Sequence, residues 1–184
     1  EIDGFRSGIR TKHQAYFDLV ERLNRYCQQV KYRLVVHNRD GQELFTACLA
    51  IKLLNDVQAA IILLERGLAS QGRSMLRVAL ECLVVLAKIA QSYEFVHAYV
   101  KVGEQDRLKL VKAIRLNPNQ GFDDVRADLT EDLIATIKET IGETQNRRNV
   151  EQWAKDVGLG HLYDGTYRLF SQEIHSSPRA IDQY

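Results

Sequence analysis

The side chains best suited to chemistry lie near the end of the chain, between Tyr167 and His175. On a helix, Arg168 and His175 stack two turns apart, and Tyr167, Ser171 and His175 form a ridge beside them. A guanidinium, an imidazole and a hydroxyl would then reach one small anion. Imidazole can move the proton of a 2′-hydroxyl, and arginine can stabilise charge on a phosphorane. This pattern predicts RNA cleavage that needs no metal, with Arg168, His175, Ser171 and Tyr167 as catalytic residues.

A structural interpretation accounts for the same four side chains. His175 would lie at the C-terminus of its helix, where the helix dipole favours a positive charge. Tyr167 and Ser171 would then hydrogen-bond to carbonyl groups of the core. The spacing alone leaves both interpretations open.

A second polar group lies on the segment from Ser70 to Gln91, which is otherwise apolar nearly all round. Its charged residues fall within an arc of about 80° on a helix; they are Arg73, Arg77, Glu81 and Lys88. Because an unpaired buried charge is costly, we expect Arg77 and Glu81 to pair with each other or across a bundle. The stripe faces either water or a polar centre within the bundle. In the second case Arg73, Arg77 and Glu81 would support the catalytic residues.

The elements that position these residues are predicted to be helices, because the apolar segments are rich in Leu and Ala and the chain has only two prolines. We expect an all-α, single-domain bundle of about six helices over residues 1–184. Residues 1–10 are expected to be disordered or extended, and residues 176–184 to form a tail. The expected helices cover about 11–36, 42–66, 70–91, 93–116, 129–146 and 163–175, with a short helix at 150–157.

Composition narrows the classes of function. The formal net charge of +1 gives no strong global attraction to nucleic acid or to an anionic membrane. Cys27, Cys48 and Cys82 are odd in number and far apart, which predicts buried, reduced thiols in a cytoplasmic protein. Uninterrupted apolar runs fall short of the roughly 20 residues that span a membrane, so no membrane partner is expected. Without a glycine-rich phosphate loop or zinc-ligand spacing, we expect neither a cofactor nor a metal.

Two sets of motifs resemble known families. Arg77-x(3)-Glu81 on the central helix, followed by Tyr167-x(3)-Ser171-x(3)-His175, resembles an uncharacterised bacterial all-helical family of unknown function, over about residues 44–181. Arg168 and His175, with six residues between them, resemble the Arg-x(4–6)-His signature of the HEPN superfamily of helical ribonucleases and nucleotide-binding domains. The position after Arg168 is Leu169, where active HEPN nucleases usually carry a polar residue.

The HEPN resemblance implies a homodimer in which Arg168 and His175 of both copies line one cleft. It also implies cleavage of RNA to a cyclic phosphate, in a toxin or phage-defence role. Two other classes of function stay open: a non-catalytic interaction domain with a partner protein, in which the polar cluster is structural, and a bundle that binds a nucleotide or another small ligand. A homodimer is expected on separate grounds, because about six helices leave part of an apolar central helix uncovered.

Overall fold

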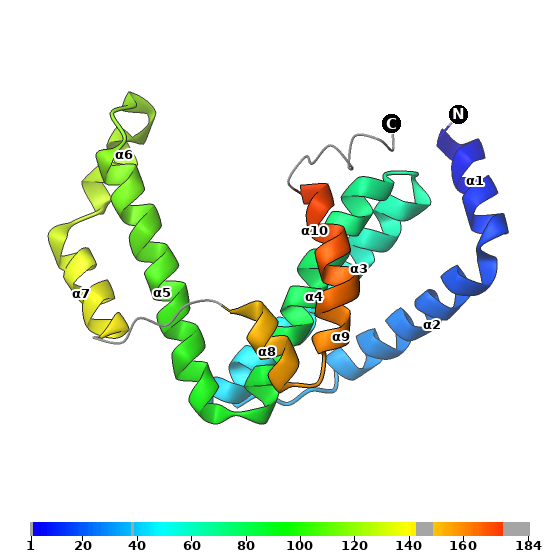
Figure 1. Ribbon diagram of the computed structural model, residues 1–184, viewed down its shortest axis with the longest axis horizontal. Coiled ribbons are helices and arrows are strands. Elements are labelled where there is room, and N and C mark those ends of the chain that lie inside the picture. The colour runs from blue at the N-terminus through cyan, green and yellow to red at the C-terminus, as the bar shows by residue number, and fades with distance from the viewer. Residues whose placement is uncertain (1, 38, 143–148, 175–184) are drawn as a thin grey trace. The chain divides into compact units, whose positions relative to one another are not determined.

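The computed structural model describes residues 2–37, 39–142 and 149–174 (Figure 1). Within these ranges the chain forms helices and no strand, which confirms the predicted all-α class. The chain divides into two compact units, one made of residues 1–91 and 150–184 and the other of residues 92–149. This division does not test the prediction of a single domain.

A helical hairpin is the centre of the first unit. It consists of α3 (Gly41–Glu65) and α4 (Ala69–Gln91), and Asp40 caps α3 by accepting hydrogen bonds from the backbone amides of Gln42 and Glu43. The turn between the helices has Gly67 at a φ of 77°, a conformation that glycine adopts without strain. The core of the hairpin includes Leu49, Ala60, Ala79, Cys82, Val85 and Ile89.

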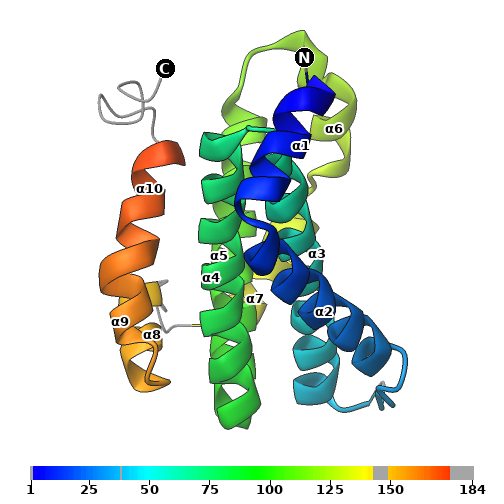
Figure 2. The same ribbon diagram turned by 90° about the vertical axis from the view of Figure 1, so that its right-hand side faces the viewer.

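The C-terminal helices of this unit pack on α4. They are α8 (Val150–Asp156), α9 (Gly160–Leu162), the π-helical segment η2 (Tyr163–Tyr167) and α10 (Arg168–Ile174). Figure 2 shows α9 and α10 along one side of α4 and α3 along the other. Trp153, Ala154 and Tyr167 are the buried side chains of this layer. The polar stripe of α4 therefore faces a second layer of helices.

The N-terminal helices, α1 (Ile2–Lys12) and α2 (Gln14–Lys31), join the hairpin through polar contacts. Arg10 donates to the buried Glu65 carboxylate of α3 over 2.6 Å, and Gln58 of α3 donates to the side-chain oxygen of Asn24 over 2.9 Å. No residue of α2 is buried. Residues 2–12 are thus helical where a disordered or extended segment was expected, and the helix expected from Thr11 to Val36 is interrupted at His13 and ends at Lys31.

The second unit is an antiparallel pair of helices, α5 (Tyr93–Leu116) and α7 (Glu131–Ile141), joined by η1 (Gln120–Phe122) and α6 (Asp123–Asp128). Ser92 and Thr130 cap the two long helices through their side-chain oxygens. Its core consists of Val111, Ile134, Ile137 and Ile141. The short elements η1 and α6 lie between residues 116 and 129, where no helix was expected, so the described residues contain more helices than the six predicted.

The helix α3 has properties that composition had not revealed. By length and hydropathy it could cross a membrane, and only 11% of its most apolar window is buried. One helix of this kind is weak evidence for a membrane segment, because core helices of soluble proteins meet the same criteria. The prediction of no membrane partner remains a prediction.

Candidate functional site

A hydrogen-bonded cluster joins α4 to the last helical layer. The Arg77 Nη2 group donates to the Tyr167 hydroxyl over 2.6 Å, and this hydroxyl donates to Glu81 Oε2 over 3.3 Å. An ion pair of 3.3 Å between Arg77 Nη1 and Glu81 Oε2 closes the ring of contacts. The side chains of Arg77 and Glu81 are 25% and 14% exposed. Three of the predicted site residues therefore form one half-buried network, which we call the polar cluster.

The ring of Tyr167 makes two further contacts. The Arg77 guanidinium lies 4.8 Å from its centroid, and the Tyr163 ring stacks on it at 4.6 Å with an angle of 18° between the planes. Both tyrosines belong to η2, a π-helical turn of a kind often found at functional sites. Burial, followed by the nearby Glu81 carboxylate, raises the pKa of Tyr167, so its hydroxyl stays protonated and able to donate at neutral pH.

Arg168 lies apart from the polar cluster. Its side chain is 57% exposed, and its Nη2 group lies 3.2 Å from Glu151 and 3.4 Å from Asp164. The guanidinium also lies over the Tyr163 ring, 5.5 Å from the centroid. Two carboxylates offset its charge, which weakens its attraction for a phosphate. Glu151 and Asp164 were absent from the predicted site, although Asp164 and Arg168 have the spacing of a helical ion pair.

The remaining predicted residues divide into three cases. The Ser171 hydroxyl donates to the Tyr167 carbonyl oxygen over 2.8 Å, a bond within the helix that leaves the hydroxyl committed to its own backbone. Arg73 lies one turn before Arg77, half-buried on α4. His175 lies outside the described residues, so the predicted pairing of Arg168 with His175 stays a prediction.

Lys88 extends the polar stripe toward the other end of α4. Its ammonium group lies 2.6 Å from Asp156 Oδ2 of α8, and this hydrogen bond, together with one from Gln152, lowers the pKa of Asp156. The charged stripe of α4 therefore contacts the last helical layer at two residues, Tyr167 and Asp156. Nothing in the local sequence pattern indicated that Asp156 would be the partner of Lys88.

The sequence also predicted three buried cysteines and no metal site. Cys82 is buried, and its thiol donates to the Leu49 carbonyl oxygen over 3.3 Å. Cys48 is exposed and Cys27 is half-buried, so the expectation of three buried thiols is wrong. Both lie on helices whose outer faces are apolar, which made them resemble core residues. Within residues 2–37, 39–142 and 149–174, no group of three or more His, Cys, Asp or Glu side chains could hold a metal ion.

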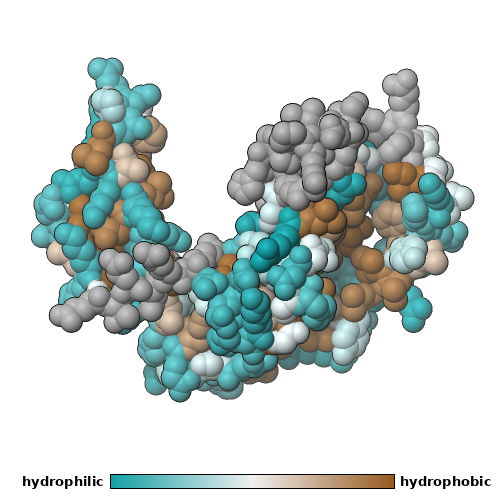
Figure 3. All heavy atoms as spheres, viewed as in Figure 1, coloured by the Kyte–Doolittle hydropathy of each residue, from teal (hydrophilic) through white to brown (hydrophobic). Residues whose placement is uncertain are grey.

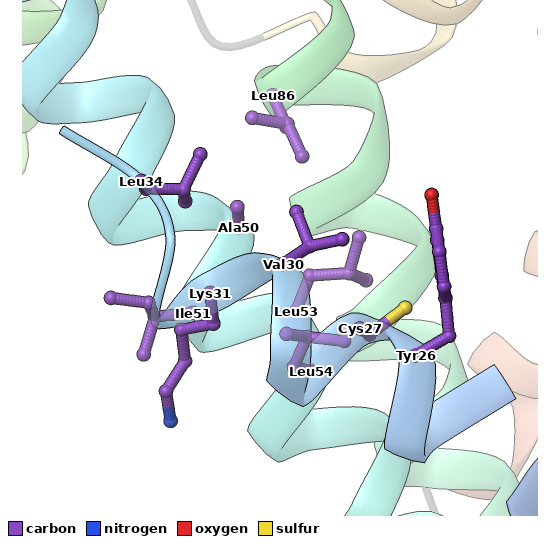
Figure 4. Close-up of a pocket in the computed structure, with 10 residues that line it drawn as sticks. All are labelled: Tyr26, Cys27, Val30, Lys31, Leu34, Ala50, Ile51, Leu53, Leu54 and Leu86. Atoms are coloured by element: carbon purple, nitrogen blue, oxygen red, sulfur yellow. The ribbon is translucent and has the colours of Figure 1, made fainter. Parts of the chain in front are cut away.

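An apolar groove lies on the opposite side of the hairpin from the polar cluster. It encloses about 240 Å³ between α2, α3 and α4, and Figure 4 shows its lining, in which the Lys31 ammonium points away from the apolar side chains. The lining residues include Tyr26, Cys27, Val30, Ile51, Leu54 and Leu86. Figure 3 shows apolar surface between α2 and the hairpin. Sequence reasoning missed this feature because apolar periodicity indicates that a helix has an apolar face but not how closely that face packs on its neighbours.

Comparison with known proteins gives one family. The sequence model of a family of unknown function, DUF5677, matches residues 43–184, which is more than half of the chain. This match confirms the resemblance to a family of unknown function. No curated protein and no solved structure matches the chain.

Proposed function

This chain belongs to the DUF5677 family of unknown function, and we propose that it is a non-catalytic helical interaction domain in which the polar cluster is structural. One observation carries the proposal: the polar groups of Arg77, Glu81 and Tyr167 bond to one another and tie α4 to η2. Ser171 and Arg168 are likewise engaged, by a backbone carbonyl and by two carboxylates. Groups committed in this way hold helices together and leave the apolar surface to contact a partner.

The alternative, RNA cleavage by Arg168 and His175, requires an arginine that is available to a phosphorane. Arg168 would have to exchange Glu151 and Asp164 for a phosphate, which costs the two ion pairs it now makes. Tyr167 would have to leave both Arg77 and Glu81. These contacts support a structural role over a catalytic one.

Substituting Tyr167 with Phe should lower the stability of the protein. The ring and its stacking are kept, but Arg77 loses a hydrogen-bond acceptor and Glu81 loses a donor, which costs about 1–2 kcal/mol. For a chain of this size, thermal melting followed by circular dichroism should show a decrease of about 3–6 °C. Tyr163→Phe is the matched control, since the Tyr163 hydroxyl makes no bond within the part of the chain the structure describes. If Tyr167→Phe and Tyr163→Phe had equal melting temperatures, that result would contradict the structural role of the Tyr167 hydroxyl.

Incubation of the purified chain with single-stranded RNA and a chelator should leave the RNA intact. Arg168→Ala and His175→Ala should behave like the wild type, because we assign neither residue a catalytic role. The products are resolved on a denaturing gel. If the wild type cleaves RNA and either substitution abolishes the cleavage while helical circular dichroism is kept, the nuclease alternative replaces our proposal.

A further inference from the structure

One flank of α2 carries an apolar stripe that the described part of the chain covers only in part. Its residues follow alternating steps of three and four, the a and d positions of a helix that packs against another helix; they are Tyr16, Leu19, Leu23, Tyr26 and Val30. These side chains are 39–73% exposed. We call them the α2 stripe. A stripe with this spacing and no charged member is typical of a helix–helix interface.

Both ends of the α2 stripe open into hollows against the hairpin. Tyr26 and Val30 line the groove of about 240 Å³, and Tyr16 lines a second apolar cavity of about 420 Å³ together with Ile61 and Leu64 of α3. The Asn24–Gln58 hydrogen bond lies on the α3 side of α2, between these two positions along the helix. A helix laid along α2 would therefore insert side chains into hollows at both ends, as knobs do into holes.

We propose that the occupant is α2 of a second copy of this chain, packed antiparallel about a two-fold axis near Leu23. In such a pair the same stripe both provides and receives side chains, as an isologous interface requires. This proposal rests on the proposed function, because it names the partner of the interaction domain. It does not rest on the family match, which begins at residue 43, after α2 ends.

The charges of α2 select the antiparallel orientation. The half from Gln14 to Arg22 carries two acidic residues and one basic residue, whereas the half from Leu23 to Lys31 carries two basic residues and no acidic one. Antiparallel packing about Leu23 places each acidic half beside a basic half, with Glu21 of one copy level with Arg25 of the other. Parallel packing would place like halves together, and the helix dipoles would also repel.

The area of the stripe is sufficient for a dimer. Its five side chains expose on the order of 500 Å² per copy, and burial of two stripes would remove about 1,000 Å², near the lower limit for a specific interface. Contacts across the two hollows of α3 and α4 would add to this area. In a monomer the α2 stripe would stay exposed to water, and it would be one of the larger apolar patches seen on soluble proteins.

Sedimentation equilibrium of the full chain tests the proposal. The wild type should be a dimer at about 100 μM, and Leu19→Glu/Leu23→Glu should weaken the dimer about 100-fold or more, because burial would leave carboxylates unpaired. Helical circular dichroism should be unchanged, since both leucines are exposed within one chain. Gln14→Glu/Gln28→Glu adds the same charge away from the stripe and should leave the dimer intact. A monomeric wild type, or a double leucine variant that stays dimeric, would overturn the proposal.

Charge reversal provides a second test that does not disturb the apolar stripe. Asp18→Arg should weaken the dimer about fivefold at low salt, because both halves of α2 then carry a net positive charge. Asp18→Arg/Arg25→Asp/Lys31→Glu should restore it, because the two halves then carry net charges of +1 and −2. A parallel pair would respond to neither change, and this result would overturn the antiparallel arrangement. Failure of these tests would leave the Tyr167→Phe and RNA experiments unaffected, so the dimer and the structural polar cluster can fail separately.

Discussion

Glu81→Ala should destabilise the protein by about 2–3 kcal/mol, because it removes one partner of a half-buried ion pair and leaves the other without compensation. Arg77 would lose the carboxylate 3.3 Å from its Nη1 group, and the Tyr167 hydroxyl would lose its acceptor. The buried Nε atom of Arg77 already has no hydrogen-bond partner among the described groups. Loss of Glu81 would therefore leave a second part of the guanidinium without an acceptor. Thermal melting should decrease by about 5–10 °C.

Two further variants separate the loss of charge from the loss of packing. Glu81→Gln keeps an oxygen that can accept from Tyr167, so it should lose about half as much stability as Glu81→Ala. The triple variant Arg77→Met/Glu81→Leu/Tyr167→Phe replaces every polar group with an apolar one of similar size and should melt within a few degrees of the wild type. If Glu81→Ala melted at the same temperature as the wild type, the polar cluster would not be what holds α4 and η2 together.

The central helices were predicted well because their ends have local causes. The expected segment from 70 to 91 corresponds to α4, and the expected segment from 93 to 116 has the bounds of α5. Ser92 accepts a hydrogen bond from the Phe95 amide at the start of α5, and Asn117 before Pro118 ends it. Signals of this kind lie within a few residues of the boundary, so the sequence alone reveals them.

The break between α1 and α2 has a tertiary cause. His13 leaves the helical conformation, with φ −120° and ψ 25°, although no glycine or proline marks the position. On α1, Arg6 and Arg10 both pair with Glu65, which lies at the far end of α3. A contact between residues 55 positions apart fixes the direction of α1. Local apolar periodicity therefore predicted neither the helix at residues 2–10 nor the break at His13.

The same contrast between local and tertiary causes explains why only part of the candidate site was predicted. Arg77 and Glu81 are four residues apart, so their pairing follows from helix geometry alone. Tyr167 and Arg168 are neighbours and point about 100° apart on a helix, so one reaches Arg77 while the other meets Glu151. The sequence pattern grouped them as one anion-binding set, and only the packing of η2 on α4 shows that they serve different contacts.

Gly72→Val should destabilise the hairpin of α3 and α4. A Cβ at this position would lie 2.7 Å from Leu64 Cγ and 3.3 Å from the Ala60 carbonyl oxygen, so the side chain of Leu64 and the α3 backbone would have to move. Overpacking of this kind costs about 2–3 kcal/mol, which should lower the melting temperature by about 5–10 °C.

The matched control for Gly72 is a helical glycine with open space around it. Gly103, within α5, has no atom within 4 Å of an added Cβ, so Gly103→Ala should keep or raise stability by up to about 1 kcal/mol through helix propensity. Gly72→Ala gains the same propensity but meets Leu64, so its net effect should be a loss. Opposite signs for the two alanine variants, measured by urea unfolding, would identify close helix approach as the reason for glycine at position 72. Stabilisation by both would mean that α3 and α4 can separate at this point without cost.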